Sequence, residues 1–415
     1  MLKRLAENVR VAREFATGKN ARARGGKIAS SKRPLFLLIV GNVAFDVDSA
    51  ASALAYAAHV SDRKKHHHEH TDTPTSADRE TTPPTFVVPA ANVPADELPI
   101  HTDALACLLH TVGSHTQTPL EHFYVNRDDL SKLQQKPKTE CEFRLILVDH
   151  NSPEPPLDQF ENAPVIEVID HHELPPGVAL PAQHRCAKVA SCATLVVEQI
   201  YADLQNAPTS TSNSTSSREN REVASLLYGA IVLDSAALTD EHKTTPRDVH
   251  VVEQLERIYH WKLDHRRQTL QQLAFAKSDV SALSLAQLLA KDYKPVTGTN
   301  PSIGMSTIPV QMEVFGSKYA ENPRDLAEFL QRRRLEVLIV RSAASGVLLV
   351  APEARQLASV CEALENDKTL NLGLKRVEPP PQLVSVEHLT LYKQSNSAIT
   401  RKQYFPMLQK CFKQS

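Results

Sequence analysis

The stretch LFLLIVGNVAFDVDS, residues 35–49, decides the fold class of this chain. Its first six residues are all apolar, which is typical of a strand buried on both faces of a parallel sheet. The alanine-rich residues 49–60 then predict a helix that begins within a few residues of the strand. A buried strand followed closely by a helix is the first half of a βαβ unit. The stretch therefore predicts an α/β fold.

Further apolar runs extend this pattern. Arg144–Val148 and Val165–Ile169 predict two more strands, whereas residues 226–233 fit either a strand or a buried helix. We therefore predict a parallel-sheet domain over residues 1–282.

The pattern changes near residue 283. A helix through Leu289 is followed by short apolar runs at 303–310, 335–340 and 346–350. We predict a second, smaller α/β domain over residues 283–415.

The composition excludes several classes of protein. The 415 residues carry 47 Lys and Arg against 48 Asp and Glu, and the net charge of -1 provides no overall attraction to nucleic acid or to an anionic membrane. Glycine is scarce, with 12 residues, and neither G-x-x-x-x-G-K nor G-x-G-x-x-G occurs. If this protein handles phosphate, it must use metal ions and side chains.

The cysteines and the apolar stretches indicate a soluble, reduced protein. The 6 cysteines form no C-x-x-C pair, which fits neither a disulfide framework nor a zinc ribbon. No uncharged apolar stretch reaches the roughly 18 residues that a membrane span requires. We expect a cytoplasmic monomer that binds neither nucleic acid nor membrane.

Three segments differ from the rest in composition. Residues 1–33 are basic, so a mitochondrial transit peptide is one interpretation, but apolar residues at helical spacing favour an amphipathic helix packed on the first domain. Residues 61–84 and 206–220 lack apolar periodicity and predict solvated insertions. The first insertion includes HHHEH at 66–70. We interpret this tract as a surface loop without a catalytic role, because nothing fixes its side chains.

Acidic residues and histidines follow the apolar runs where each run ends. The segments are GNVAFDVDS at 41–49, VDHN at 148–151, IDHHE at 169–173 and VLDS at 232–235. The carboxyl ends of parallel strands share one edge of a sheet, so these side chains are expected to converge there. Each segment alone is more typical of a turn or a helix cap, and Asp48 could cap the alanine-rich helix. Their combination favours a functional site.

Converging carboxylates repel one another unless cations neutralise them. The charges of four aspartates match two divalent ions; these residues are Asp46, Asp48, Asp149 and Asp234. Oxygen and imidazole ligands suit Mg²⁺, Mn²⁺, Co²⁺ or Zn²⁺. The D-x-D spacing lets Asp46 and Asp48 each face a different ion, since residues two apart in an extended segment point the same way.

Together these motifs resemble the DHH superfamily of phosphoesterases, and within it the exopolyphosphatase and prune branch that carries a DHHA2-type C-terminal domain. The strings LLAKDYK at 288–294 and TRKQ at 400–403 favour this class over RecJ-like nucleases, whose G-G-H signature is missing from this sequence. The resemblance implies a DHH domain, a DHHA2 domain and an active site between them.

The resemblance also implies a centre of two divalent ions, with Mg²⁺ as the first candidate. Asp46 and Asp149 would hold one ion, and Asp149 would bridge to the second. The second ion would be held by Asp48, Asp149, His171 and Asp234. Where family II pyrophosphatases have a histidine ligand this chain has Asn42, which is a candidate ligand of the first ion, so that ion is expected to bind less tightly.

The remaining site residues are assigned by the same resemblance. His172 would protonate or hydrogen-bond the leaving oxygen, or alternatively only orient a ligand. Phosphate oxygens would be bound by the cations Lys294, Arg401 and Lys402. Ser191 and Thr194 would donate hydrogen bonds to the substrate, although a helix cap explains the same residues.

We therefore predict a metal-dependent exopolyphosphatase that removes terminal orthophosphate from linear inorganic polyphosphate, with a water molecule activated by two ions as nucleophile. Three alternatives stay open. They are a prune-like enzyme for short polyphosphates or nucleotides, an inorganic pyrophosphatase, and a phosphate-binding interaction protein without turnover.

Overall fold

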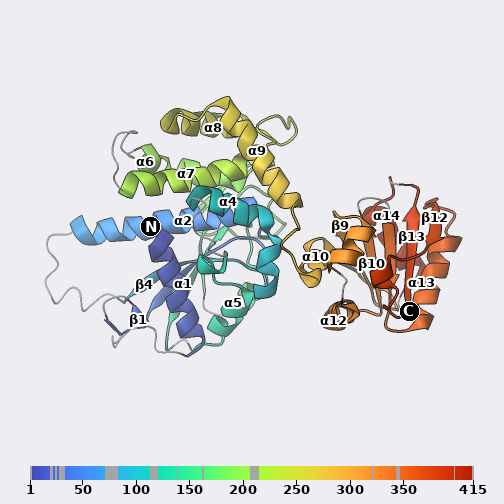
Figure 1. Ribbon diagram of the computed structural model, residues 1–415. Coiled ribbons are helices and arrows are strands. Elements are labelled where there is room, and N and C mark those ends of the chain that lie inside the picture. Colours follow the sequence, from blue (N-terminus) through green and yellow to red (C-terminus); the bar gives the residue numbers. More distant parts are fainter. Residues whose placement is uncertain are drawn as a thin grey trace. The chain divides into compact units, whose positions relative to one another are not determined.

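The computed structural model of this chain describes residues 2–18, 22–23, 26–27, 33–70, 83–112, 120–137, 139–160, 163–205, 215–319, 322–342, 346–396 and 398–413. The chain forms two compact units, Met1–Lys277 and Ser278–Ser415 (Figure 1). The predicted boundary between residues 282 and 283 falls in the connection that follows this division.

A five-stranded sheet forms the centre of the first unit. Its strands lie in the order β4, β3, β5, β6, β7, and every neighbouring pair is parallel. The strands are β3 (Leu35–Val40), β4 (Thr85–Ala90), β5 (Glu142–Val148), β6 (Val165–Asp170) and β7 (Gln183–Cys186). The structure confirms the parallel sheet and the three strands predicted from apolar runs.

The strand order creates a switch point beside β3. This strand comes first among the five and lies between β4 and β5, so the chain moves outward on one side of β3 and later on the other. In open α/β sheets the loops that follow two such strands diverge and leave a crevice. Asp46 follows β3 and Asp149 follows β5, so the topology places both acids at this point.

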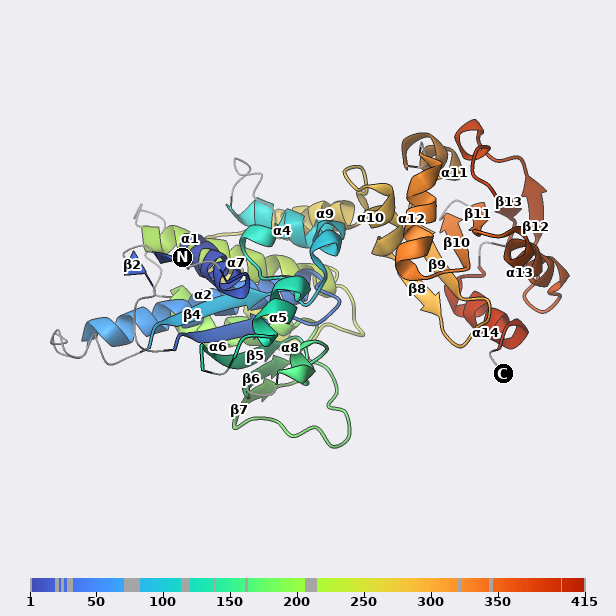
Figure 2. The same ribbon diagram turned by 90° about the horizontal axis from the view of Figure 1, so that it is seen from below.

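Helices cover both faces of the sheet (Figure 1 and Figure 2). Because side chains alternate along a strand, Leu37 and Ile39 pack against α2, α4, α6 and α7, whereas Phe36 and Leu38 pack against α1 and α5. The helices are α1 (Leu2–Ala16), α2 (Val47–His70), α4 (Thr102–Val112), α5 (Arg127–Gln134), α6 (Cys192–Gln205), α7 (Thr215–Asp234), α8 (Pro246–Tyr259) and α9 (Leu263–Ser278).

The predicted amphipathic helix at the N-terminus is confirmed as α1. Leu5, Val9 and Ala12 are buried in the cores on the sheet. Arg13 near its end donates to Asp129 at 2.7 Å and to the Tyr124 carbonyl at 2.8 Å. Apolar packing and these polar contacts together attach α1 to the first unit.

Two local predictions need correction. Residues 226–233, which fitted a strand or a helix, belong to helix α7. Helix α2 continues to His70, so the loop predicted from residue 61 is wrong for its first ten residues, and the histidine tract lies in the last turns of this helix. Residues 215–220 are likewise helical. Residues 71–82 and 206–214 of the predicted insertions lie outside the described residues, and residues 83–84 directly precede β4.

The second unit contains a mixed six-stranded sheet in the order β12, β13, β11, β10, β9, β8. Helices α10 and α12 pack on one face, and α13 and α14 pack on the other. The strands are β8 (Tyr293–Val296), β9 (Ile303–Ile308), β10 (Val337–Ser342), β11 (Gly346–Val350), β12 (Leu374–Val377) and β13 (Leu389–Gln394). The helices are α10 (Leu285–Lys291), α11 (Met312–Val314), α12 (Pro323–Arg333), α13 (Ala354–Asn366) and α14 (Arg401–Cys411).

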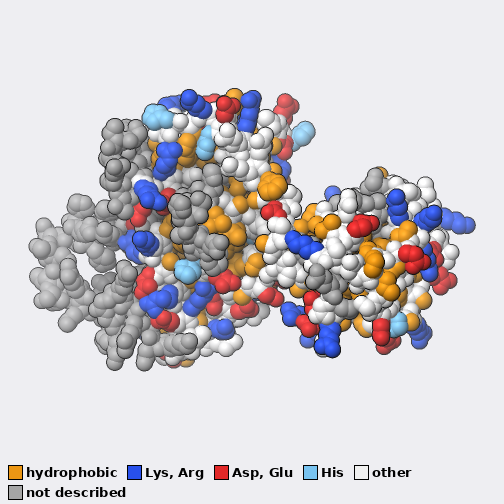
Figure 3. All heavy atoms as spheres, viewed as in Figure 1, with side chains coloured by type: hydrophobic (Ala, Val, Ile, Leu, Met, Phe, Trp, Pro, Cys, Tyr) orange, Lys and Arg blue, Asp and Glu red, His pale blue; other side chains and the backbone are white. Residues whose placement is uncertain are grey.

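The described surface mixes both signs of charge. On the face drawn in Figure 3, blue and red side chains are interspersed over both units, in keeping with the net charge of -1. Among the described residues, no helix has the length and apolar character needed to cross a bilayer.

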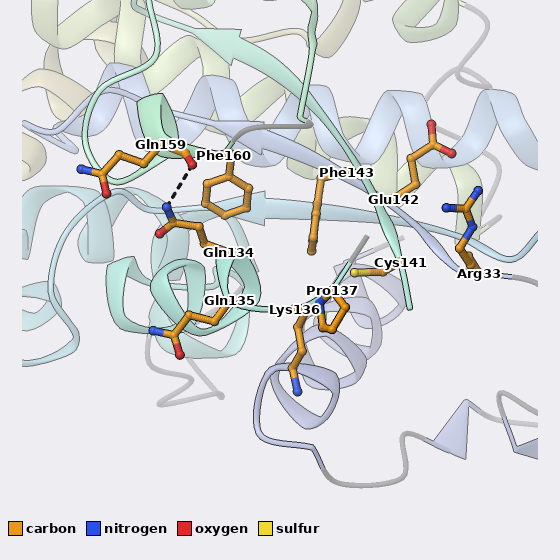
Figure 4. A pocket seen from close by; sticks show the side chains of 10 residues that line it. All are labelled: Arg33, Gln134, Gln135, Lys136, Pro137, Cys141, Glu142, Phe143, Gln159 and Phe160. Atoms are coloured by element: carbon orange, nitrogen blue, oxygen red, sulfur yellow. Dashed lines mark hydrogen bonds between the residues drawn. The ribbon is translucent and has the colours of Figure 1, made fainter. Parts of the chain in front are cut away.

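A pocket of about 620 Å³ opens at the amino ends of β3 and β5 (Figure 4). Phe143 and Phe160 line it, and the Gln134 amide donates to the Gln159 carbonyl at 3.1 Å. Strand rise separates this end of β5 from Asp149 by about 20 Å. The pocket is therefore separate from the acidic cluster at the carboxyl ends of the strands.

Candidate metal centre

Asp149 lies at the centre of a cluster of acidic and imidazole side chains. It directly follows β5 and has a left-handed backbone, with φ of 64°, which Asp and Asn tolerate better than most residues. Its backbone N–H still donates to the Ile169 carbonyl at 2.9 Å. The turn buries the Asp149 carboxylate to 2% exposure among residues that follow β3 and β6.

The two carboxylate oxygens of Asp149 have different surroundings. Oδ2 accepts hydrogen bonds from Asn42 Nδ2 and Ser49 Oγ, each at 2.8 Å. Oδ1 is buried and accepts no hydrogen bond from the described residues. It does have His171 Nε2 at 3.1 Å and His172 Nδ1 at 3.8 Å. A buried carboxylate oxygen without a donor is costly, so Oδ1 is suited to bind a cation.

The orientation of His171 shows why its ring does not simply satisfy Oδ1. Its Nδ1 lies 2.9 Å from the Val189 carbonyl, which can only accept, so the neutral ring carries its proton on Nδ1. The Nε2 lone pair then faces Asp149 Oδ1 at 3.1 Å and Asp48 Oδ2 at 3.8 Å. Lone pairs that face each other this closely require a proton or a metal ion between them.

The electrostatics of this contact favour positive charge. Burial lowers the pKa of His171, but the hydrogen bond that a protonated Nε2 would donate to Asp149 and the charge of Asp48 outweigh it and raise this pKa to about 10. Positive charge placed between these groups is therefore strongly stabilised.

The two acids of the D-x-D motif cap different helices. Asp46 Oδ1 accepts from the Ser49 N–H at 3.1 Å, so Asp46 caps α2. Asp48 was the cap considered from the sequence, but its two oxygens accept from the Cys192 and Ala193 N–H groups, at 2.6 and 2.9 Å. Asp48 therefore caps α6 across the fold, and its position depends on residues 189–194, which we call the α6 turn.

Three carboxyl groups of the cluster hold their protons more tightly than usual. Burial and then the charge of Asp149 raise the pKa of Asp46, and the same causes raise the pKa of Asp48 well above its ordinary value. Burial, with the charges of Asp46 and Asp149, raises the pKa of Asp234 to about 7. Divalent ions remove such repulsion, so these residues fit a metal centre.

Asn42 has a different role from the one predicted. Its Nδ2 donates to Asp149, and its Oδ1 accepts from the Ala44 N–H at 2.9 Å and the Phe45 N–H at 3.2 Å. Because both ends of the amide already have partners, Asn42 is not free to act as a metal ligand in this structure. Instead it orients the Asp149 carboxylate.

Comparisons with known proteins identify the family. The model described as "DHH family, N-terminal domain" matches residues 37–231, and the "DHHA2 domain" model matches residues 271–411. Exopolyphosphatase PRUNE1 of Homo sapiens is 31% identical over 385 residues, covering 91% of this chain and 75% of the human protein. This chain belongs to the DHH family.

Three further proteins are also similar to the chain. A putative exopolyphosphatase of Schizosaccharomyces pombe is 26% identical, covering 92% of this chain and 93% of that protein. The manganese-dependent inorganic pyrophosphatase of Bacillus subtilis is 24% identical over 64% of this chain and 82% of that enzyme. A crystal structure described as a Methanococcus jannaschii putative family II inorganic pyrophosphatase covers 91% of this chain and 99% of that one, with 17% identity and a TM-score of 0.41.

The DHH motif after β6 is held by its own aspartate. Asp170 is fully buried, and its Oδ1 lies 2.8 Å from His172 Nδ1 while Oδ2 accepts from Asn151 Nδ2 at 2.7 Å. The carboxylate fixes the proton of the neutral His172 ring on Nδ1 and leaves Nε2 available. The His172 side chain is 53% exposed, so this nitrogen can reach a ligand.

Two predicted substrate contacts are placed elsewhere by the structure. Ser191 and Thr194 are fully buried, and Thr194 Oγ1 donates to Asp248 at 2.6 Å. The Ser191 hydroxyl accepts from the Ala193 N–H at 3.3 Å. Both residues therefore belong to the start of α6, as the helix-cap alternative suggested, and we do not include them among the substrate contacts.

In the second unit the predicted cations lie near one another. Lys294 is on β8, and Arg401 and Lys402 open α14, which packs beside this strand. Arg401 Nη1 donates to the Asp292 carboxylate at 2.6 Å and to its carbonyl at 3.0 Å. Lys294 and Lys402 are exposed. The fold thus gathers residues that are about 110 positions apart into one basic group.

Proposed function

We propose that this chain is a metal-dependent exopolyphosphatase that hydrolyses the terminal phosphoanhydride bond of linear inorganic polyphosphate and releases orthophosphate. The observation that carries the proposal is the unsatisfied Oδ1 of Asp149, which faces His171 Nε2 at 3.1 Å among buried carboxylates. Relatives named exopolyphosphatase that cover more than nine tenths of the chain support the substrate class.

Two divalent ions suit the charge of this cluster. We propose that Asp46 and Asp149 hold one ion. The ligands proposed for the other are Asp48, Asp149, His171 and Asp234. Mg²⁺ is our first candidate, and the relatives named manganese-dependent pyrophosphatases support testing Mn²⁺ beside it. When bound, such ions lower the pKa of a water molecule and neutralise charge on the phosphoryl oxygens.

His172 is the proposed proton donor. When the bond between phosphorus and the bridging oxygen breaks, that oxygen gains negative charge, and a proton from Nε2 of the imidazolium neutralises it. Asp170 accepts from Nδ1 at 2.8 Å. The buried carboxylate thus orients the ring and leaves Nε2 to face the substrate.

The second unit supplies cations for the polyphosphate chain. We propose that Lys294, Arg401 and Lys402 bind its phosphate oxygens. Arginine offers a planar fork of donors and lysine a compact charge, so the group can bind several oxygens of one polyanion. Asp292 fixes the Arg401 side chain in the absence of substrate.

Inorganic pyrophosphatase activity is the second candidate. It is favoured by relatives with that name, which cover up to 64% of this chain. Asn42 counts against it, because the amide at this position donates to Asp149 and offers no imidazole. We therefore expect pyrophosphate to be a poorer substrate than longer chains.

The test is a phosphate-release assay of the purified full chain, first stripped of metal and then supplied with Mg²⁺, Mn²⁺, Co²⁺ or Zn²⁺. Long polyphosphate, tripolyphosphate, pyrophosphate and a cyclic nucleotide are compared as substrates. We expect release from polyphosphate only when metal is present. Faster release from pyrophosphate would favour the second candidate, and binding of polyphosphate without release from any substrate would indicate an interaction protein.

A further inference from the structure

The α6 turn contacts two proposed ligands of one ion. The Val189 carbonyl orients the His171 ring through Nδ1 at 2.9 Å. At the other end of the turn, the N–H groups of Cys192 and Ala193 bind the two oxygens of Asp48 at 2.6 and 2.9 Å. The geometry of both ligands therefore depends on where this turn lies.

Asp248, far along the chain on α8, holds the α6 turn from both ends. Its Oδ2 accepts from the Ala190 N–H at 3.0 Å, and its Oδ1 accepts from Thr194 Oγ1 at 2.6 Å. Its own position is fixed by Thr245, whose N–H and hydroxyl donate to Oδ2 at 2.8 and 2.7 Å. One carboxylate thus connects the start of α8 to the start of α6.

These contacts exceed what capping of α8 requires. Helix α5 begins with the same kind of capping box, in which the buried Asp129 accepts from Asn126 and Arg13. Asp248 is fully buried and receives four hydrogen bonds, two of them from the neighbourhood of the metal centre. Burying a carboxylate costs free energy, which only a well-formed set of donors offsets. The local helix cap leaves the two contacts to the α6 turn unexplained.

We propose that Asp248 is a positioning residue of the metal centre. It fixes the α6 turn, and the turn in turn presents the Val189 carbonyl to His171 and two N–H groups to Asp48. Asp248 touches neither substrate nor ion. The inference rests on the proposed function, because that proposal makes His171 and Asp48 ligands of one ion.

The test measures metal binding directly. Mn²⁺ is titrated into the metal-free full chain by isothermal calorimetry, with wild type compared to Asp248→Ala. Loss of partners that orient ligands typically weakens metal binding by about 10- to 100-fold. We expect that loss of affinity for the ion proposed to bind Asp48 and His171, and little change for the other ion. Asp129→Ala is the matched control, since it removes a buried capping-box aspartate whose partners lie on α1 and α5.

A milder pair of variants covers the case in which Asp248→Ala does not fold. Thr194→Val and Thr245→Val each delete one hydroxyl that donates to Asp248, on the α6 side and the α8 side respectively. Thr194→Val should weaken binding of the ion held by Asp48 and His171, whereas Thr245→Val should not. Thermal unfolding of each variant in EDTA reports general loss of stability separately.

Unchanged Mn²⁺ affinity in Asp248→Ala would overturn the inference. So would an equal loss of affinity in Thr194→Val and Thr245→Val, because it would indicate general loosening of α8. Wild type that binds no divalent ion would instead overturn the proposed function itself. The inference is supported if wild type binds two ions and if Asp248→Ala and Thr194→Val, but not Thr245→Val or Asp129→Ala, weaken the binding of one of them.

Discussion

At Asp149 a left-handed backbone and an unsatisfied carboxylate oxygen coincide in one residue. Asp149→Asn keeps a residue type that tolerates this backbone, but it removes the charge and one of two oxygens. We predict that the variant folds, binds Mn²⁺ more weakly, and releases phosphate at least about 10³-fold more slowly at saturating metal. Rates are measured on polyphosphate, with the exposed Asp158→Asn as the control. A near wild-type rate would contradict the two-ion centre.

Asp170 permits a second prediction at the same scale. Asp170→Asn replaces the carboxylate that fixes the orientation of His172 through Nδ1 with a neutral amide. We expect kcat to fall by about 10²- to 10⁴-fold with little change in KM, because proton transfer is impaired while substrate contacts remain. Steady-state kinetics on tripolyphosphate separate the two constants. A change in KM alone would show that His172 only binds.

The pKa of Asp234 predicts how the metal-free protein responds to pH. Its pKa rises from the ordinary 3.8 to about 7 in the fold. The folded chain therefore binds more protons than the unfolded chain between these values, so stability falls as pH rises through this window. In EDTA the thermal midpoint should be lower at about pH 8 than at about pH 5, and saturating Mn²⁺ should reverse much of the loss.

A matched pair of variants tests this assignment. Asp234→Asn should flatten the pH dependence in EDTA, because an amide does not titrate. The same substitution at Asp264, which is 83% exposed, should leave it unchanged. An equal slope in wild type and Asp234→Asn would assign the effect to other groups.

The proposed ligands follow from motifs in the sequence, whereas the hydrogen bonds that orient them do not. Asp46, Asp149 and Asp234 each follow an apolar run, and the carboxyl ends of neighbouring elements converge in this fold class. Ser49 and Asp170 lie within these motifs, but their contacts to Asp149 and Asn151 join separate segments, and Asp248 contacts the start of α6 from α8. Tertiary packing brings these partners together, and no periodic pattern in a single sequence reveals which residues will meet.

At the scale of elements, apolar runs located the strands more reliably than the helices. The run at 35–40 coincides with β3, but 226–233 lies in α7, because a helix buried on all sides loses its amphipathic period. Polar residues 61–70 continue α2 without any apolar stripe. Good helix formers such as Lys and Glu sustain such an extension once the helix has begun.

Helix α1 provides a prediction at this scale. Leu5 is fully buried in the core that includes α2, so Leu5→Ala should lower the free energy of unfolding by about 2–5 kcal/mol. Chemical denaturation followed by circular dichroism measures this change. The exposed Lys3→Ala is the control. A cost below about 1 kcal/mol would mean that α1 contributes little to the first unit.

At the scale of the whole molecule, the proposed metal ligands and the proposed phosphate-binding lysines lie in different units. The first holds the acidic cluster, and the second holds Lys294 and Lys402 on its surface. We predict that Lys294→Ala with Lys402→Ala raises KM for polyphosphate by about 10-fold or more, and more steeply for longer chains, because each lost cation removes a phosphate contact. Lys375→Ala, on the opposite edge strand β12, is the matched control.

Salt provides a further check on the same prediction. Binding of a polyanion by cations weakens as salt rises, and the double variant should show a shallower salt dependence of KM than wild type. Identical KM values and salt slopes in both proteins would show that these lysines are ordinary surface residues.

The left-handed turn at Asp149 also has an evolutionary consequence. A single base change converts an aspartate codon to an asparagine codon, and asparagine suits the same backbone. The lineage can thus lose turnover in one step while keeping a stable fold and its basic second unit. By the proposed function, a descendant of that kind would bind polyphosphate without hydrolysing it, and the same variant made in the laboratory is suited to trapping bound substrate.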